Sequence, residues 1–171
     1  MQIQQQPIKN RVDESGIITF NLEEYFPKDE IIAFDLQAFL FQGLIIREKD
    51  YRKALMELDF SIYQNKTVCI FCSADAIIPI WAFMLAAVHL QPVAAKIFYG
   101  NAENFIQQQM NEQLQTIDFA TFSDQRVVIK GCGDKPVPAG VYVEITRLLL
   151  PFAKTIMYGE PCSTVPLYKK K

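Results

Sequence analysis

Hydrophobic and polar positions follow a regular succession along the second half of the chain, in which short apolar runs alternate with longer amphipathic ones. The apolar runs have the length of buried strands and cover residues 67–72, 96–99, 126–130 and 155–158. Apolar residues at helical spacing fill the segments between them, at 76–90, 102–116 and 137–150. Strands that alternate with helices in this way predict an α/β fold with a mostly parallel sheet.

The strands of this sheet are continuously apolar, as strands are when helices cover both faces. We therefore predict a three-layer α/β sandwich whose strand order, by approximate starting residue, is 94-67-126-155. Two further strands, at 16–22 and 31–36, are added from the N-terminal part, and a short helix at 37–42 and a longer one at 48–58 follow. The polar residues 1–15 are predicted to be a loose segment, residues 16–171 a single domain, and we find no internal repeat.

Composition and charge narrow the range of partners. The chain has 171 residues, half of them hydrophobic, and a formal net charge of −2, which argues against a nucleic acid or a membrane surface as its partner. The longest apolar stretch, 76–90, contains Pro79 and is too short to span a membrane. We see no export signal, so the four cysteines are expected to be reduced thiols of a cytoplasmic protein. The apolar helix positions Trp81, Phe83 and Met84 are expected to be core, with a homo-oligomer contact as the alternative.

Three of the four cysteines come just after predicted strands. Cys72 ends one strand, and Cys132 and Cys162 follow the strands at 126–130 and 155–158. Ligands of open α/β sheets bind at this carboxyl edge. Cys69 and Cys72 form a CxxC, but residues three apart on a strand point to opposite faces, so Cys69 is expected to be a core residue.

With the predicted strand order, Cys72, Cys132 and Cys162 lie on neighbouring loops and converge on one point. Three thiolates suit a zinc ion or an iron–sulfur cluster, and Asp75 and Asp134 stand nearby in sequence as further ligands. Helix N-termini after Cys72 and Cys132 would favour the thiolate form. Two alternatives stay open. One is a thiol-dependent enzyme or sulfur acceptor, and the other is a non-catalytic interaction module whose cysteines are packed.

The stretch "KGCGDKPVP", residues 130–138, joins a predicted strand to a predicted helix. Gly131 and Gly133 would let the backbone approach a bound group closely, and Lys135 could meet an anion. The stretch lacks the spacing of a P-loop and the third glycine of a dinucleotide fingerprint. These three residues are therefore candidates for cofactor binding without a specific nucleotide motif.

The stretches "IKNRVDESGIITFNLEEYFP", "CSADAIIPIWAFML" and "IKGCGDKPVPAGVYVEITRLLLPFAKTIMYGEPCSTVPLYK" resemble the bacterial family called domain of unknown function 2480. The resemblance covers nearly the whole chain, and Cys72, Cys132 and Cys162 fall within these stretches. It implies a cytoplasmic protein with iron–sulfur assembly proteins as partners. It assigns no catalytic residue. The combined hypothesis is a metal-binding accessory protein of iron–sulfur cluster biogenesis.

Overall fold

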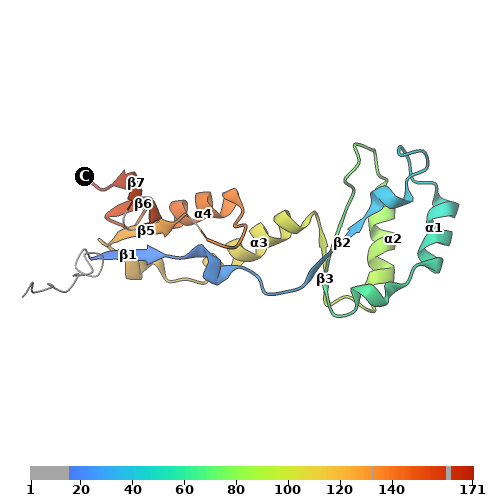
Figure 1. Cartoon of the computed structure of the whole chain (residues 1–171), viewed down its shortest axis with the longest axis horizontal. Coiled ribbons are helices and arrows are strands. Elements are labelled where there is room, and N and C mark those ends of the chain that lie inside the picture. The colour runs from blue at the N-terminus through green and yellow to red at the C-terminus, as the bar shows by residue number, and fades with distance from the viewer. Residues whose placement is uncertain (1–15, 132, 161–162) are drawn as a thin grey trace, which may run out of the picture. The chain divides into compact units, whose positions relative to one another are not determined.

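The computed structural model describes residues 16–131, 133–160 and 163–171 (Figure 1). The predicted loose segment 1–15 lies outside the described residues. The chain divides into two compact units, one formed by residues up to 26 together with 109–171, and the other by 27–108. We call them the outer unit and the inserted unit, because the second interrupts the first along the chain.

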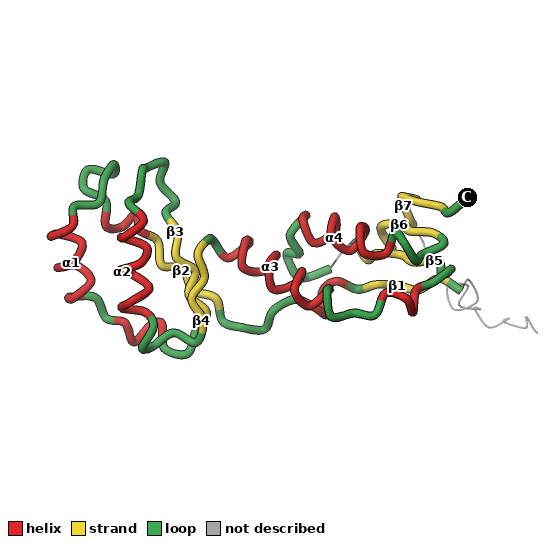
Figure 2. Tube along the Cα trace, turned by 180° about the vertical axis from the view of Figure 1, so that it is seen from behind, coloured by secondary structure: helices red, strands yellow, loops and turns green. Residues whose placement is uncertain are grey.

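The inserted unit is built on a parallel sheet of three strands, β2 (Ile31–Asp35), β3 (Thr67–Phe71) and β4 (Lys96–Tyr99), in the order β2-β3-β4. The helices α1 (Glu48–Glu57) and α2 (Ile80–Leu90) connect them. Figures 1 and 2 show both helices side by side on the same side of this sheet. This follows from the strand order, because successive right-handed crossovers that advance in one direction place their helices on one face.

The core of the inserted unit lies between this sheet and its two helices. Tyr51 and Leu55 of α1 and Ala82 of α2 are fully buried in it. The hydroxyl of Tyr51 donates a hydrogen bond of 3.2 Å to the backbone oxygen of Ala82. The small alanine lets the two helices approach closely at this point.

The outer unit contains a sheet of four strands, β1 (Ile17–Phe20), β5 (Arg126–Lys130), β6 (Thr155–Glu160) and β7 (Ser163–Lys169), in the order β1-β5-β6-β7. The first three are parallel, and β7 pairs antiparallel with β6. The helix α4 (Ala139–Leu149) connects β5 to β6, and α3 (Ala102–Leu114) runs from the inserted unit into the outer unit along the chain. We did not predict β7, whose Pro166 is tolerated because β7 is an edge strand.

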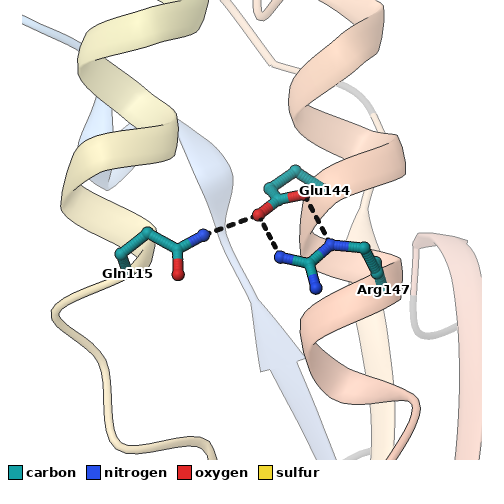
Figure 3. A network of polar contacts seen from close by, with 3 residues as sticks. All are labelled: Gln115, Glu144 and Arg147. Carbon is teal, nitrogen blue, oxygen red and sulfur yellow. Dashed lines mark hydrogen bonds and ion pairs between the residues drawn. The ribbon is translucent and has the colours of Figure 1, made fainter.

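Within the outer unit, a polar network joins the residue after α3 to α4 (Figure 3). Gln115 donates a hydrogen bond of 2.6 Å to Glu144, and Arg147 donates two, of 2.7 and 2.9 Å, to the same carboxylate. The hydrogen bonds from Arg147 outweigh the effect of burial and lower the pKa of Glu144. Glu144 thus holds the end of α3 and the middle of α4 at a fixed spacing.

The two units repeat one another. The pattern of apolar and polar positions over residues 48–101 recurs, without gaps, 59 positions later. Ten consecutive positions of α2, residues 81–90, have the same succession of buried, half-buried and exposed side chains as residues 140–149 of α4. Strand order is the same as well, since β2-β3-β4 matches β1-β5-β6.

Backbone details recur at the same spacing. Asn65 and its counterpart Asp124 both take a left-handed conformation, with φ of 59° and 56°. The backbone N–H of Asn65 donates to the oxygen of Val93 at 2.9 Å, and that of Asp124 donates to the oxygen of Phe152 at 3.0 Å. Left-handed backbone at a non-glycine residue is uncommon, so its recurrence in one hydrogen-bonded turn marks a shared architecture.

The first strands correspond as well, at a spacing of 14 positions. Asn21 follows β1 and accepts a hydrogen bond from the backbone of Glu23, and Asp35 ends β2 and accepts one from the backbone of Gln37. Each begins a short 3-10 helix, Leu22–Tyr25 and Leu36–Phe39. Our expectation of no internal repeat is therefore wrong. Few of the paired residues are identical, and what recurs is their hydrophobicity and backbone conformation.

The α/β class is confirmed, and the predicted strand order is partly wrong. The neighbours 67–71 with 96–99, and 126–130 with 155–160, are as predicted. The predicted pairing of β3 with β5 does not occur, because β3 lies between β2 and β4, and β5 lies between β1 and β6. The two isoleucine-containing strands near the N-terminus, which were expected to join one sheet, belong to two separate sheets instead. The grouping of residues 16–171 as one domain stays a prediction.

Two helices begin later than predicted. The segments 76–90 and 137–150 become helical at Ile80 and Ala139, directly after Pro79 and Pro138. A residue before proline is disfavoured in helical conformation, which moves the start to the proline itself. Each connection from strand to helix is therefore longer than predicted, and described residues of these connections line the cavities described next.

Candidate functional site

A cavity of about 460 Å³ opens at the carboxyl ends of the strands of the outer unit. Its walls come from the segment after β1, from the end of β5 and described residues of the loop after it, and from side chains of α4 and β6. This is the edge at which parallel α/β sheets bind ligands, and the volume lies within the range of small-molecule sites. We call it the cationic cavity, for the residues Lys130 and Lys135 on its wall.

One wall of the cationic cavity is fixed by Tyr158 of β6. Its hydroxyl donates a hydrogen bond of 3.2 Å to the backbone oxygen of Gly131. The ring stands so close that a Cβ on Gly131 would come within 2.6 Å of it. Tyr142 of α4 meets this ring edge-on, at 5.8 Å between centroids. Gly131 is therefore required for the close approach of the aromatic pair to the loop.

A second wall is fixed by Glu23, from the short helix after β1. Its carboxylate accepts a hydrogen bond of 2.6 Å from the backbone N–H of Lys135 and packs against Gly133, where a Cβ would clash with it. The Lys135 ammonium donates to the backbone oxygen of Glu23 at 3.1 Å and lies 5.4 Å from the centre of the Phe26 ring. The loop after β5 is thus held against the segment after β1 by several contacts.

Lys130 is the last residue of β5 and is half-buried on the cavity wall. No ion pair of its ammonium is found among the residues that the structure describes. Two ammonium groups and one carboxylate therefore line the cavity, and that carboxylate is already engaged by the loop. The local charge favours an anionic ligand.

Three residues predicted for cofactor binding, Gly131, Gly133 and Lys135, lie on the wall of this one cavity. Their binding of a cofactor stays a prediction. Sequence reasoning missed Glu23, Tyr142 and Tyr158, which reach the cavity from other elements. Tyr158 carried a usable signal, because it is the last residue of the predicted strand 155–158 and so stands at the sheet edge where ligands bind. Glu23 carried none, because its role depends on β1 pairing with β5.

The prediction that Cys72 converges with the other two cysteines assumed that β3 pairs with β5, and this pairing does not occur. This residue follows β3, in the sheet of the inserted unit, and β3 has no pairing with β5 or β6. No helix begins beside it either, because α2 starts only at Ile80. Its thiol donates instead to the backbone oxygen of Ala74 at 3.7 Å. Asp75 and Asp134 are both exposed on their loops.

Cys132 and Cys162, the other two predicted ligands, lie outside the described residues. Within the part that the structure does describe, no three histidine, cysteine, aspartate or glutamate side chains are grouped so that they could hold a metal ion. The metal hypothesis thus stays a prediction. Cys69, in contrast, is fully buried in β3 as expected, and burial raises the pKa of its thiol.

Comparison with protein families decides the chain's membership. The model of the family described as "Protein of unknown function (DUF2480)" matches residues 6–170. The chain belongs to this family. The resemblance found in the sequence is thereby confirmed. No curated protein and no solved structure matches the chain.

Membership of this family carries no activity with it, so the chemistry of the site has to come from its residues. The described residues include no helix that is long and apolar enough to cross a membrane. The feature from which a function can be argued is the cavity at the sheet edge, which is lined by two lysines and two tyrosines.

Proposed function

We propose that this member of the DUF2480 family binds a small anionic molecule in the cationic cavity of the outer unit. The observation that carries the proposal is the joint placement of Lys130 and Lys135 on one cavity wall at the carboxyl edge of the sheet. Ammonium groups on a concave surface attract carboxylate and phosphate groups, and the aromatic pair of Tyr142 and Tyr158 offers a flat apolar surface to the rest of the ligand.

Hydrogen bonds between the elements of the wall support the binding of a ligand in one orientation. Tyr158 is tied to Gly131, and Lys135 is tied through its backbone to Glu23. A site that is already organised loses little conformational entropy when its ligand binds. The ligand class that this supports is a small carboxylate or phosphate that carries an apolar or aromatic group.

Inorganic phosphate is the first probe, with the backbone amide signals of Gly131 and Lys135 followed by NMR. Saturable shifts of these signals are expected, and Lys135→Met should weaken binding about ten-fold through loss of a charged donor. Lys154→Met is the matched control, because Lys154 directly precedes β6, at the opposite edge of the sheet from the cavity. Unsaturable shifts, or equal weakening by both variants, would contradict the proposal.

A second candidate function is thiolate binding of zinc or an iron–sulfur cluster, as a cytoplasmic accessory protein beside iron–sulfur assembly proteins. One observation favours it. β5 and β6 are parallel neighbours, and Cys132 and Cys162 follow these two strands in sequence, with Asp134 close by. Cys72 is no longer part of this proposed set.

Elemental analysis of protein purified without oxygen or chelator tests this second candidate. Near-stoichiometric zinc or iron that is lost in Cys132→Ser, and kept in Cys72→Ser, would support it. Protein that takes up neither metal after reconstitution would overturn it. A single thiol that reacts much faster than the others would favour the thiol-dependent enzyme or sulfur acceptor instead.

A further inference from the structure

The inserted unit has a cavity of its own, of about 440 Å³, at the carboxyl ends of β3 and β4. Seven of its eleven lining residues correspond, 59 positions earlier, to residues of the cationic cavity, and the other four are Ile80, Gly100, Asn101 and Asn104. Cys72 corresponds to Gly131, Phe83 to Tyr142, and Tyr99 to Tyr158; both members of each pair line their own cavity. The repeat of the fold therefore extends to the cavity at its sheet edge.

The aromatic pair on the wall has the same geometry in both units. Phe83 and Tyr99 meet edge-on at 5.1 Å with an interplanar angle of 85°. Tyr142 and Tyr158 meet at 5.8 Å with an angle of 81°. Two rings conserved in placement between repeats, and exposed at a cavity in each, point to a shared way of holding a flat ligand.

The charge of the wall differs between the two cavities. Phe71 stands where the outer unit has Lys130, and Ala76 stands where it has Lys135. None of the side chains that line the cavity of the inserted unit is an aspartate, glutamate, lysine or arginine. We call it the neutral cavity. A charged ligand would lose its hydration there and find no partner of opposite charge.

Two amide side chains give the neutral cavity its polar side. Asn101 and Asn104, at the start of α3, line it, and each accepts a hydrogen bond from the backbone N–H of the other, at 2.9 and 3.2 Å. These bonds use the carbonyl oxygens of both amides and fix their orientation. The NH₂ groups donate no hydrogen bond to residues that the structure describes, so they are available to a carbonyl or hydroxyl oxygen of a ligand.

We propose that the neutral cavity is a second ligand site, the internal duplicate of the cationic cavity, and that it takes an uncharged aromatic molecule bearing a hydrogen-bond acceptor. Positions 71 and 76 in the inserted unit, and 130 and 135 in the outer unit, set which charge each site accepts. The claim that the two cavities take ligands of different charge rests on the function proposed for the cationic cavity. The binding of a neutral ligand here rests only on the wall of this cavity.

Benzamide and benzoate form a matched pair of probes, because they share a ring and a carbonyl group and differ in charge. The full chain is titrated with each, and the amide signals of Gly100 and Asn104 are followed by NMR. Benzamide should shift both signals saturably, with a dissociation constant on the order of 1 mM for so small a molecule. Benzoate should leave them nearly unchanged. Phosphate at Gly131 and Lys135 is read in a separate titration, so failure of one site is distinguishable from failure of the other.

Replacement of Ala76 tests the role of charge directly. Ala76→Lys restores the lysine of the outer unit, and Ala76→Gln adds a side chain of similar length without charge. Ala76→Lys should strengthen benzoate binding about five-fold over Ala76→Gln, by one added ion pair at a partly exposed site. Unchanged amide signals of Tyr51 and Leu55, in the core of the inserted unit, show that each variant is folded.

Three results would overturn this inference. The first is an absence of saturable benzamide shifts at Gly100 and Asn104. The second is benzoate binding as tight as benzamide binding at these residues in the unaltered chain. The third is equal benzoate affinity in Ala76→Lys and Ala76→Gln, which would show that this position does not determine the charge of the ligand.

Discussion

The hydroxyl of Tyr158 donates a hydrogen bond of 3.2 Å to the backbone oxygen of Gly131, and its ring occupies the space that a Cβ on Gly131 would need. These contacts hold β6 against the loop after β5 at the opening of the cationic cavity. In the inserted unit the corresponding residues are Tyr99 and Cys72. Tyr99 is 71% exposed, against 38% for Tyr158, and β4 is an edge strand, whereas β6 lies between β5 and β7.

Gly131→Ala is expected to destabilise the protein by about 1–3 kcal/mol, because the added methyl forces the Tyr158 ring out of its position. Chemical denaturation measures the change. The loss of the ring's position should also reduce phosphate binding at the cationic cavity.

The Gly131→Ala/Tyr158→Ala double variant is the control for this prediction. If the ring is the cause, Gly131→Ala costs far less stability in the background of Tyr158→Ala than alone. Equal costs in the two backgrounds would show that the backbone, and not the contact with the ring, requires glycine.

Asp35 gives the inserted unit a stability that depends on pH. Burial raises the pKa of its carboxyl, but hydrogen bonds from Ser73 and from the backbone of Gln37 outweigh this and lower it. Because the pKa is lowered in the folded state, the ionised Asp35 carboxyl stabilises the fold. This stabilisation is present above the unfolded pKa of about 3.9 and is lost as pH falls through the folded pKa.

Asp35→Asn should therefore cost about 0.5–1 kcal/mol at pH 7, a value reduced by the partial exposure of the site. Asparagine keeps one acceptor, as Asn21 does in the outer unit. Denaturation at pH 7 and at pH 3 measures the difference between the variant and the unaltered protein. The prediction fails if that difference is as large at pH 3 as at pH 7.

Tyr51→Phe should destabilise the inserted unit by about 1 kcal/mol, because the hydroxyl donates to the oxygen of Ala82 inside the core. The matched control is Tyr63→Phe, since the Tyr63 hydroxyl has no hydrogen-bond partner among the described residues. Equal effects of the two variants on the midpoint of urea denaturation would count against a role for this bond.

The same tyrosine should respond to alkaline pH. Burial strongly raises the pKa of Tyr51. Folding therefore favours the neutral phenol of Tyr51. The stabilisation that it contributes is complete below the unfolded pKa of about 10 and is lost as pH rises above that value. In a titration of phenolate absorbance, Tyr51 should ionise only as the protein unfolds, so Tyr51→Phe removes one late step. Loss of an early step instead would contradict its burial.

The two cysteines of the CxxC should differ sharply in reactivity. Cys69 is fully buried and burial raises the pKa of its thiol, while Cys72 is half-buried at a cavity. Iodoacetamide should modify Cys72 in the native protein and Cys69 only after denaturation. Peptide mass spectrometry at timed intervals measures both rates. Similar rates in the native protein would show that β3 opens easily.

The sequence pattern located most strands and helices, because buried strands and amphipathic helices leave their period in the order of apolar residues. The strands at Lys96–Tyr99 and Arg126–Lys130 were predicted to the residue. The same pattern placed Gly131, Gly133 and Lys135 at a strand end, where the cationic cavity is found. Local chemistry alone sufficed for this, since glycine and proline after a strand indicate a loop.

Only the tertiary structure decided which strands are neighbours. Apolar strands of similar length can pair in several orders, and no local signal separates β3–β5 from β3–β2. In the structure, β1 pairs with β5 and β2 pairs with β3, so each of these N-terminal strands belongs to a separate sheet. That pairing removed Cys72 from the predicted cysteine cluster, brought Glu23 to the loop after β5, and revealed two cavities of the same architecture and different charge. The sequence by itself thus determined the elements and their buried faces, while the pairing of distant strands determined which side chains share a site.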